Sequence, residues 1–433
     1  MSLSGDIGAT QQSRLAGWLG SSAGKFSADV IFAALSQALG RGSLILASII
    51  ISNFMATQSF AVFTYFNLTI SAIAAFSTLG LGTAAARIFA EGAAGAHEQT
   101  QARMRTVLLL ATVAAVAGAL AVLVLPAAWI GDLVHAHRSL LACGIALVTF
   151  NTVALGALSG RGAFGTLALA ATLGSVVLLG GVATAALHDS TSFVLLAVII
   201  SMAAQAAVYL IALNRLLPGR EEGFPGSAEV RSVLQIAGPM FLTSLVVAGI
   251  FWVLGRIVLQ QENGIAEFAR YAVGLQWFAL TLLIPSIVTR VFFPRIVRAA
   301  SSENCEGRPL VLANAGANLL IAAGIGAVIL LAGDVLLLLY GNAEITQSSA
   351  FHWFVLAAIV ASPVNGLGNA IIARDPGPRH WLSLKVVWAL LAAAATLHLT
   401  AEITAASAAF ALFAAYCCLV PASLLVLRLQ KLI

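Results

Sequence analysis

Long, uninterrupted apolar runs are the feature that most limits what this chain can fold into. About twelve occur, and each is long enough to cross a bilayer as a helix, which takes roughly 20 residues. Strands of membrane barrels are excluded because they are short and alternate in polarity. The sequence therefore predicts an all-α polytopic membrane protein, with spans near residues 30–53, 58–82, 104–128, 139–160, 163–187, 192–214, 232–260, 267–293, 309–332, 347–372, 381–400 and 404–427.

The composition excludes the soluble classes of protein. Of 433 residues, 60% are apolar and 9% are charged, whereas an ordinary soluble domain carries roughly 25% charged residues. So few charges cannot cover the surface of a soluble enzyme, a nucleic-acid-binding domain or a disordered chain. The four cysteines form no Cys-x-x-Cys pair and no Cys/His ligand spacing. We therefore expect no metal, no cofactor and no nucleic-acid partner.

Basic residues cluster in alternate connections between the predicted spans. If the N-terminus is cytoplasmic, most of the 22 Lys and Arg residues fall on the cytoplasmic side, as the charge asymmetry of membrane proteins requires. Lys385 is counted among these cytoplasmic charges. We therefore expect both termini in the cytoplasm, which requires an even number of spans. The connections on the outer face are short and leave no room for a further domain.

The chain divides into two similar halves. Residues 215–231 are rich in Pro, Gly and charge and predict a cytoplasmic linker between a bundle of residues 1–214 and a bundle of residues 232–433. Tyr65 and Tyr271 occupy comparable places in the two halves, within FAVFTYFNLTISAIAAFSTLG and FARYAVGLQWFALTLLIPSIV. Two pseudo-symmetric six-helix bundles that both start inside are related by an axis along the membrane normal. We expect such a pair to enclose a central cavity.

Arg41 is the ionisable residue placed deepest in a predicted span. It lies roughly 16 Å into the first span at 1.5 Å per residue, and no acidic residue lies one turn away. Gln37 and Ser48 extend it into a polar stripe along one face, which must meet a wet cavity or another helix. One interpretation is that Arg41 binds an anionic ligand such as a phosphate. The other is that it bonds to backbone carbonyls or pairs with a distant acid.

Arg256 and four amides complete the candidate binding residues. Arg256 lies nearer the outer end of its span, where snorkelling to the interface and ligand binding are both open. Amide side chains inside spans usually form hydrogen bonds between helices, but amides also suit sugar hydroxyls. The candidates for contact with a substrate are Asn67, Asn151, Gln276 and Asn365.

The sequence lacks the residues and motifs that several kinds of transport and catalysis require. No Asp or Glu lies in the middle of a predicted span, although exporters coupled to protons or sodium usually need a buried carboxylate. The motifs of P-loop nucleotide-binding proteins, zinc proteases and serine hydrolases are missing as well. The sequence therefore gives no support to a bound ATP or to catalysis of a covalent change.

Several segments together resemble a known transporter family. They are FAVFTYFNLTISAIAAFSTLGLGTAAAR (60–87), IAGPMFLTSLVVAGIFWVLGRIVL (236–259), ARYAVGLQWFALTLLIPSIVTRVFFPRI (269–296), LLYGN (338–342) and NGLGNAIIARDPGPRHW (365–381). The pattern is similar to the polysaccharide-export branch of the multidrug/oligosaccharidyl-lipid/polysaccharide exporter superfamily, in particular to its Wzx-type flippases of lipid-linked oligosaccharides. The resemblance covers nearly the whole chain.

The resemblance implies a function as well as a fold. It implies two bundles around a cationic cavity, and alternating access that moves an undecaprenyl-pyrophosphate-linked oligosaccharide across a bacterial inner membrane. Cavity arginines hold the pyrophosphate in that family, which favours Arg41 and then Arg256. The implied partners are the lipid-linked substrate, membrane lipid, a polysaccharide polymerase and a chain-length regulator.

Two other functions remain as alternatives. A cation-coupled exporter of drugs or small molecules would share the fold, but the missing carboxylates and the positive charge in the first span speak against it. A membrane enzyme that polymerises or ligates glycans would present reactive groups on a sizeable outer loop. The short outer loops make this second alternative the weaker of the two.

Overall fold

The computed structural model describes residues 31–78, 80–93, 98–216, 226–289, 307–342, 345, 349–374, 379–398 and 402–430. Regular structure within these ranges is helical, and twelve helices are long and apolar enough to span a membrane. This confirms the all-α class and the predicted number of spans. The predicted linker, 215–231, overlaps residues 217–225, which lie outside the described ranges, so that boundary stays a prediction.

The first half begins with the span Ile31–Phe54. Helix α2 ends at Ser77 and α3 begins at Leu81, so the predicted span 58–82 is divided before its end, and α3 continues into the residues expected to connect it to the next span. The helices of this half are α2 (Thr57–Ser77), α3 (Leu81–Ala93), α4 (Glu98–Val124), α5 (Ala127–Ile130), α6 (Asp132–His135), α7 (Arg138–Gly160), α8 (Phe164–Leu187) and α9 (Thr191–Leu216).

The second half begins with the longest helix, α10, of 33 residues. The span that starts with α11 stays helical as far as Thr289. The helices of this half are α10 (Ser227–Leu259), α11 (Gly264–Thr281), α13 (Gly307–Leu331), α14 (Gly333–Leu338), α16 (Ser349–Arg374), α17 (Arg379–His398) and α18 (Ala405–Leu429).

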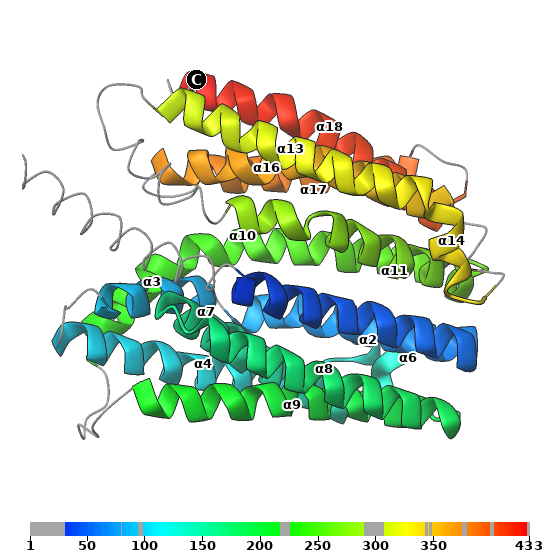
Figure 1. Ribbon diagram of the computed structural model, residues 1–433, viewed down its shortest axis with the longest axis horizontal. Coiled ribbons are helices and arrows are strands. Elements are labelled where there is room, and N and C mark those ends of the chain that lie inside the picture. The colour runs from blue at the N-terminus through cyan, green and yellow to red at the C-terminus, as the bar shows by residue number, and fades with distance from the viewer. Residues whose placement is uncertain are drawn as a thin grey trace, which may run out of the picture.

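The helices form two bundles that lie side by side. Figure 1 shows α4, α7, α8 and α9 on one side and α13, α16, α17 and α18 on the other, with α10, α11 and α2 between them. The closest packing within the first bundle joins α8 to α9 and α3 to α7, and within the second α16 to α18 and α13 to α16. Two six-helix bundles are therefore present, as predicted.

The outer faces of the bundles are apolar. On α4, the side chains of Leu109, Val113, Val116 and Leu120 follow one face at helical spacing, and all four are exposed. Exposed apolar stripes of this kind would be costly in water but match the hydrocarbon of a bilayer. The packing therefore agrees with a multi-pass membrane protein.

The two ends of the bundles carry different elements. We call the end where α10 and α17 begin and α18 finishes the linker end, and the end with α5, α6 and α14 the opposite end; they lie at the left and right of Figure 1. Helix α10 contacts both bundles. Near the linker end, Val233 and Ala237 belong to the core of the first half, while Phe251 packs against Trp388 of α17.

Candidate functional site

Arg41 lies where the two halves meet. Its Nη1 atom donates a hydrogen bond of 2.5 Å to the backbone carbonyl of Ala279 on α11, 238 residues away in the sequence. The side chain is half-buried. This contact agrees with the interpretation in which Arg41 bonds to a backbone carbonyl, and it places the guanidinium between the halves.

The rest of the polar stripe also faces the second half. Gln276 on α11 donates from Nε2 to Oγ of the buried Ser48 at 2.7 Å. The hydroxyl of Tyr340 donates in turn to Oε1 of Gln276 at 3.1 Å. Gln37, one turn before Arg41, is half-buried. The stripe was expected to face either a wet cavity or another helix. In the structure, Arg41 and Ser48 contact a neighbouring helix, α11.

Arg256 joins the halves in the reverse direction. Its Nη2 donates at 2.5 Å to the carbonyl of Ala128 in α5, across the boundary between the halves. Its guanidinium carbon lies 5.4 Å from the centre of the Trp252 ring, and the hydroxyl of Tyr65 is close enough to interact with it. Its Nη1 is buried and finds no acceptor within the described ranges. Arg256 is therefore engaged by protein groups of both halves.

Further contacts close the same boundary toward the opposite end. We call the boundary the seam; it joins the first span and α2 to α10, α11 and residues 339–342. Asn53 donates from Nδ2 to the carbonyl of Leu339 at 2.6 Å, and Asn342 donates to Oγ1 of Thr57 at 2.8 Å. At Gly341, whose φ is +63°, an added Cβ would lie 2.0 Å from Oδ1 of Asn53. A side chain at this position would therefore displace the amide of Asn53 and would also adopt a strained backbone conformation.

The seam also contains aromatic contacts. Tyr65 meets Phe268 edge-on with ring centres 5.4 Å apart, and Phe60 meets Tyr340 at 6.3 Å. Trp252 donates from Nε1 to Thr69 at 3.2 Å. These pairs join α2 to α10, α11 and Tyr340, so contacts across the seam run from mid-span to the opposite end.

The remaining amides mostly bond to backbone. Asn67 donates to the carbonyl of Phe63 within its own helix at 2.8 Å. Asn151 donates to the carbonyl of Met202 on α9 at 3.0 Å. Asn365 is half-buried in α16. The contacts of Asn67 and Asn151 agree with the structural interpretation of such amides, and a role in substrate binding stays a prediction for all three.

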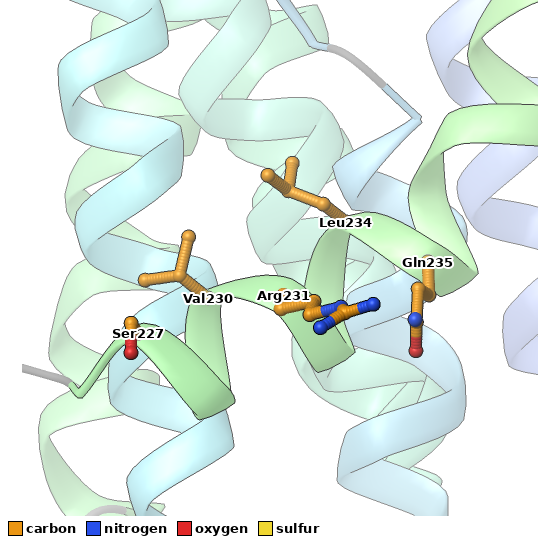
Figure 2. A pocket seen from close by; sticks show the side chains of 5 residues that line it. All are labelled: Ser227, Val230, Arg231, Leu234 and Gln235. Atoms are coloured by element: carbon orange, nitrogen blue, oxygen red, sulfur yellow. The ribbon is translucent and has the colours of Figure 1, made fainter.

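A hollow of about 710 Å³ opens at the linker end, beside the start of α10. Figure 2 shows Arg231 and Gln235, one turn apart and both exposed, next to each other along this helix. Their donors and the apolar side chains beside them form a surface of mixed character. The lining residues are Ser227, Val230, Arg231, Leu234 and Gln235.

Lys385 is a buried cation that the sequence analysis did not identify as a candidate site residue. It was counted among the charges of the cytoplasmic side, but its side chain is only 6% exposed inside the second half and does not face solvent. Its Nζ lies 4.7 Å from the ring centre of Trp381, 5.1 Å from that of Trp388 and 5.9 Å from that of Tyr416. The available signal was the pattern W-x-x-x-K-x-x-W, which puts both indoles on the lysine's helix face.

Groups suited to a metal ion are missing from the described ranges. No cluster of three His, Cys, Asp or Glu side chains occurs in them. The charged side chains that donate hydrogen bonds across the seam are those of Arg41 and Arg256, and guanidiniums bind oxyanions rather than metal cations.

Sequence relatives are polysaccharide export proteins. The chain is 24% identical over 386 residues to the EPS I polysaccharide export inner membrane protein EpsE of Ralstonia solanacearum, with 88% of each chain covered. The protein of the same name from Ralstonia nicotianae matches to the same extent. No family model matches the chain. The relationship is distant, but it extends over most of both chains.

Solved structures of transporters share the fold. A multidrug resistance MATE family transporter of the MOP superfamily, in an inward-facing conformation, superposes with a TM-score of 0.67 at 17% identity and covers 91% of this chain and 95% of its own. A MOP superfamily transporter from Pyrococcus furiosus, described as having a binding pocket of reversed polarity, gives a TM-score of 0.67 at 17% identity, with 93% and 96% covered. The fold therefore agrees with the distant sequence relationship.

Proposed function

We propose that this chain, a transporter of the MOP superfamily, moves an undecaprenyl-pyrophosphate-linked oligosaccharide from the cytoplasmic to the outer face of a bacterial inner membrane. The distant relatives named as polysaccharide export inner membrane proteins support this substrate class. The clustering of basic residues toward the linker end supports a cytoplasmic location for that end and for both termini. A polysaccharide polymerase and a chain-length regulator would act on the exported unit.

One observation carries the proposal: two guanidiniums lie on the seam, and each donates to a backbone carbonyl of the opposite half. Arg41 reaches Ala279, and Arg256 reaches Ala128. Bonds from a guanidinium to phosphate oxygens are charge-assisted and bidentate, and they are stronger than bonds to a neutral carbonyl. A pyrophosphate that enters between the halves therefore competes with contacts that hold the halves together.

This competition suggests how binding leads to movement. When the pyrophosphate takes the guanidinium of Arg41, the contact with α11 is lost, and the two bundles are freer to rock about the seam. The lipid tail stays in the bilayer, because transfer of its methylene groups to water is costly. The positive charge lowers the cost of carrying a pyrophosphate past hydrocarbon.

The alternative is export of an organic cation, because the structural relatives include multidrug resistance transporters. A cation at the seam would meet Arg41 and Arg256 and would be repelled. The relative with reversed polarity of its binding pocket indicates that the fold is compatible with such an arrangement of charge. We therefore place the cation exporter second.

The test replaces Arg41 in the full chain, reconstituted in vesicles with a labelled polyprenyl-pyrophosphate-linked sugar. A charge-assisted bond contributes about 1.5–3 kcal/mol, so Arg41→Ala should lower the apparent affinity roughly 10- to 100-fold, and Arg41→Lys should retain part of it. The matched control is Arg428→Ala, since Arg428 is exposed near the linker end of α18.

Undiminished transfer by Arg41→Ala, at equal protein amount, would remove the central role given to this residue. Transfer of an organic cation instead of the lipid-linked sugar by the unmodified chain would favour the alternative function.

A further inference from the structure

Lys385 occupies a cage of aromatic rings inside the second half. Trp381 and Trp388 come from its own helix, one turn before and one turn after it, and Tyr416 comes from α18. Phe251 of α10 packs on Trp388 with ring centres 6.2 Å apart, and Phe278 of α11 stacks on Tyr416 at 6.1 Å. The cage therefore lies where four helices of this half meet.

The cage offers hydrogen-bond donors without acceptors. In the part of the chain that the structure describes, no carboxylate or carbonyl accepts from the ammonium of Lys385, which faces ring surfaces instead. The Nε1–H of Trp388 is also buried without an acceptor there. Attraction to the rings compensates part of the cost of burying the cation, but the N–H groups still lack the partners that buried donors normally have.

The cage is also close to the seam. Ala279 accepts the hydrogen bond from Arg41, and the adjacent residue, Phe278, stacks on Tyr416 of the cage. Neighbouring residues of α11 thus contact Arg41 toward the first half and the cage toward the second. The cage of Lys385 therefore lies on the other side of this helix from Arg41.

We propose that Lys385 and Trp388 form a second anion-binding site, which accepts an oxyanion of the transported molecule between the ammonium and the indole N–H. The oxyanion is a carboxylate of an acidic sugar or a phosphate of the lipid carrier, since both supply the missing acceptors. This inference rests on the proposed function and adds a charge requirement to its substrate.

The flexible stem of lysine allows the site to open. Four methylene carbons carry the ammonium, so it can leave the ring faces for an oxyanion while its stem stays packed. At Gly368 of α16, an added Cβ would lie 2.4 Å from the Trp381 ring, so this glycine gives the indole the room that it occupies. Displacement of the ammonium changes the surroundings of both indoles, which makes them reporters of binding.

The test measures tryptophan fluorescence of the full chain in lipid nanodiscs during titration with sodium glucuronate, inorganic pyrophosphate or glucose. We expect a saturable change with at least one of the two oxyanions and none with glucose. Lys385→Met should abolish the change, and Lys385→Arg should retain it. The matched control is Arg379→Met, an exposed cation of the same helix, which should behave as the unmodified chain.

The two oxyanions distinguish the source of the charge. A response to glucuronate alone assigns the site to an acidic sugar, and a response to pyrophosphate alone assigns it to the carrier. If Lys385→Met does not fold, Trp388→Phe keeps an aromatic ring but removes the pyrrole part of the indole with its orphan N–H, and calorimetric titration should show anion binding weakened at least threefold. A response unchanged in Lys385→Met, or no response to either anion, would show that the caged lysine is only a structural cation.

The outcome is separable from that of the Arg41 test. Anion binding at Lys385 without transfer of the lipid-linked sugar would leave the site standing and overturn the proposed function. Transfer of the lipid-linked sugar by the unmodified chain, with an anion response that persists in Lys385→Met, would overturn the second site alone.

Discussion

Gly80 and Gly162 have nearly the same backbone conformation but very different surroundings. Their φ angles are +71° and +75°. Any L-residue is strained in this region, even where its side chain meets no neighbouring atom. At Gly80 an added Cβ would also lie 2.3 Å from the carbonyl oxygen of Ala237 on α10, whereas at Gly162 nothing lies within 4 Å. A substitution at Gly162 therefore measures backbone strain alone, whereas the same substitution at Gly80 measures backbone strain together with the close contact with α10.

We predict that Gly80→Ala destabilises the protein much more than Gly162→Ala. The change at Gly162 should cost about 1–2 kcal/mol from backbone conformation, and the change at Gly80 should cost at least about 1–3 kcal/mol more, as overpacking does. Thermal unfolding of the purified variants measures the difference. Equal midpoints for the two variants would mean that α10 can move away from Gly80 at little cost.

At the scale of single residues, the sequence identified Arg41 but not its partner. Its depth in an apolar run was readable without a structure, whereas the carbonyl of Ala279 that it meets is distant in sequence. Lys385 shows the opposite case. It lies near the start of its span, so its position resembled that of an interfacial charge, and only the packing of α17 against α18 encloses it.

At the scale of helices, the start of α18 depends on a residue of α11. Glu267 accepts a hydrogen bond from the backbone N–H of Ala405 at 2.7 Å and pairs with Arg270. Thr404 and Ser407 complete a capping box at the same helix start. A carboxylate at a helix N-terminus satisfies an orphan N–H group and interacts favourably with the helix dipole.

We predict that Glu267→Ala loosens the opposite end of α18. Loss of the cap and of the charge at this partly buried position should cost about 1–3 kcal/mol. Hydrogen exchange of the first turn of α18 should accelerate, and the unfolding midpoint should fall. Glu262→Ala is the matched control because Glu262 is exposed in the loop before α11; identical exchange in the two variants would contradict the capping role.

The helices themselves were predictable because each satisfies its own backbone hydrogen bonds and meets lipid on one face. The break between α2 and α3 was not predicted, since the apolar run continues through it. The short helices α5, α6 and α14 at the opposite end were also not expected, because segments this short carry little apolar periodicity.

At the scale of the whole molecule, the seam joins the halves toward the opposite end, and α10 also packs on the first half near the linker end. Thr57 and Asn342 are hydrogen-bonded across the seam at 2.8 Å, near the opposite end. By comparison, Ser77 and Thr149 are hydrogen-bonded to each other inside the first half. Alternating access requires the first kind of contact to break and leaves the second kind intact.

We predict that a disulfide between Thr57→Cys and Asn342→Cys, in a chain whose four native cysteines are replaced, abolishes transfer of the lipid-linked sugar. Reduction should restore it, because the link prevents the opposite end from opening. A disulfide between Ser77→Cys and Thr149→Cys should leave transfer nearly unchanged. Full transfer by the oxidised seam variant would show that these two positions stay together during transport.

The number of spans, their places along the chain and the all-α class followed from the sequence alone. Hydrocarbon requires each span to be a run of about 20 apolar residues whatever its neighbours are. Tertiary structure decided which polar groups meet: Arg41 with Ala279, Gln276 with Ser48, and Lys385 with its three rings. These contacts join helices far apart in the sequence, and lipid-facing hydropathy carries no information about which faces of two helices pack together.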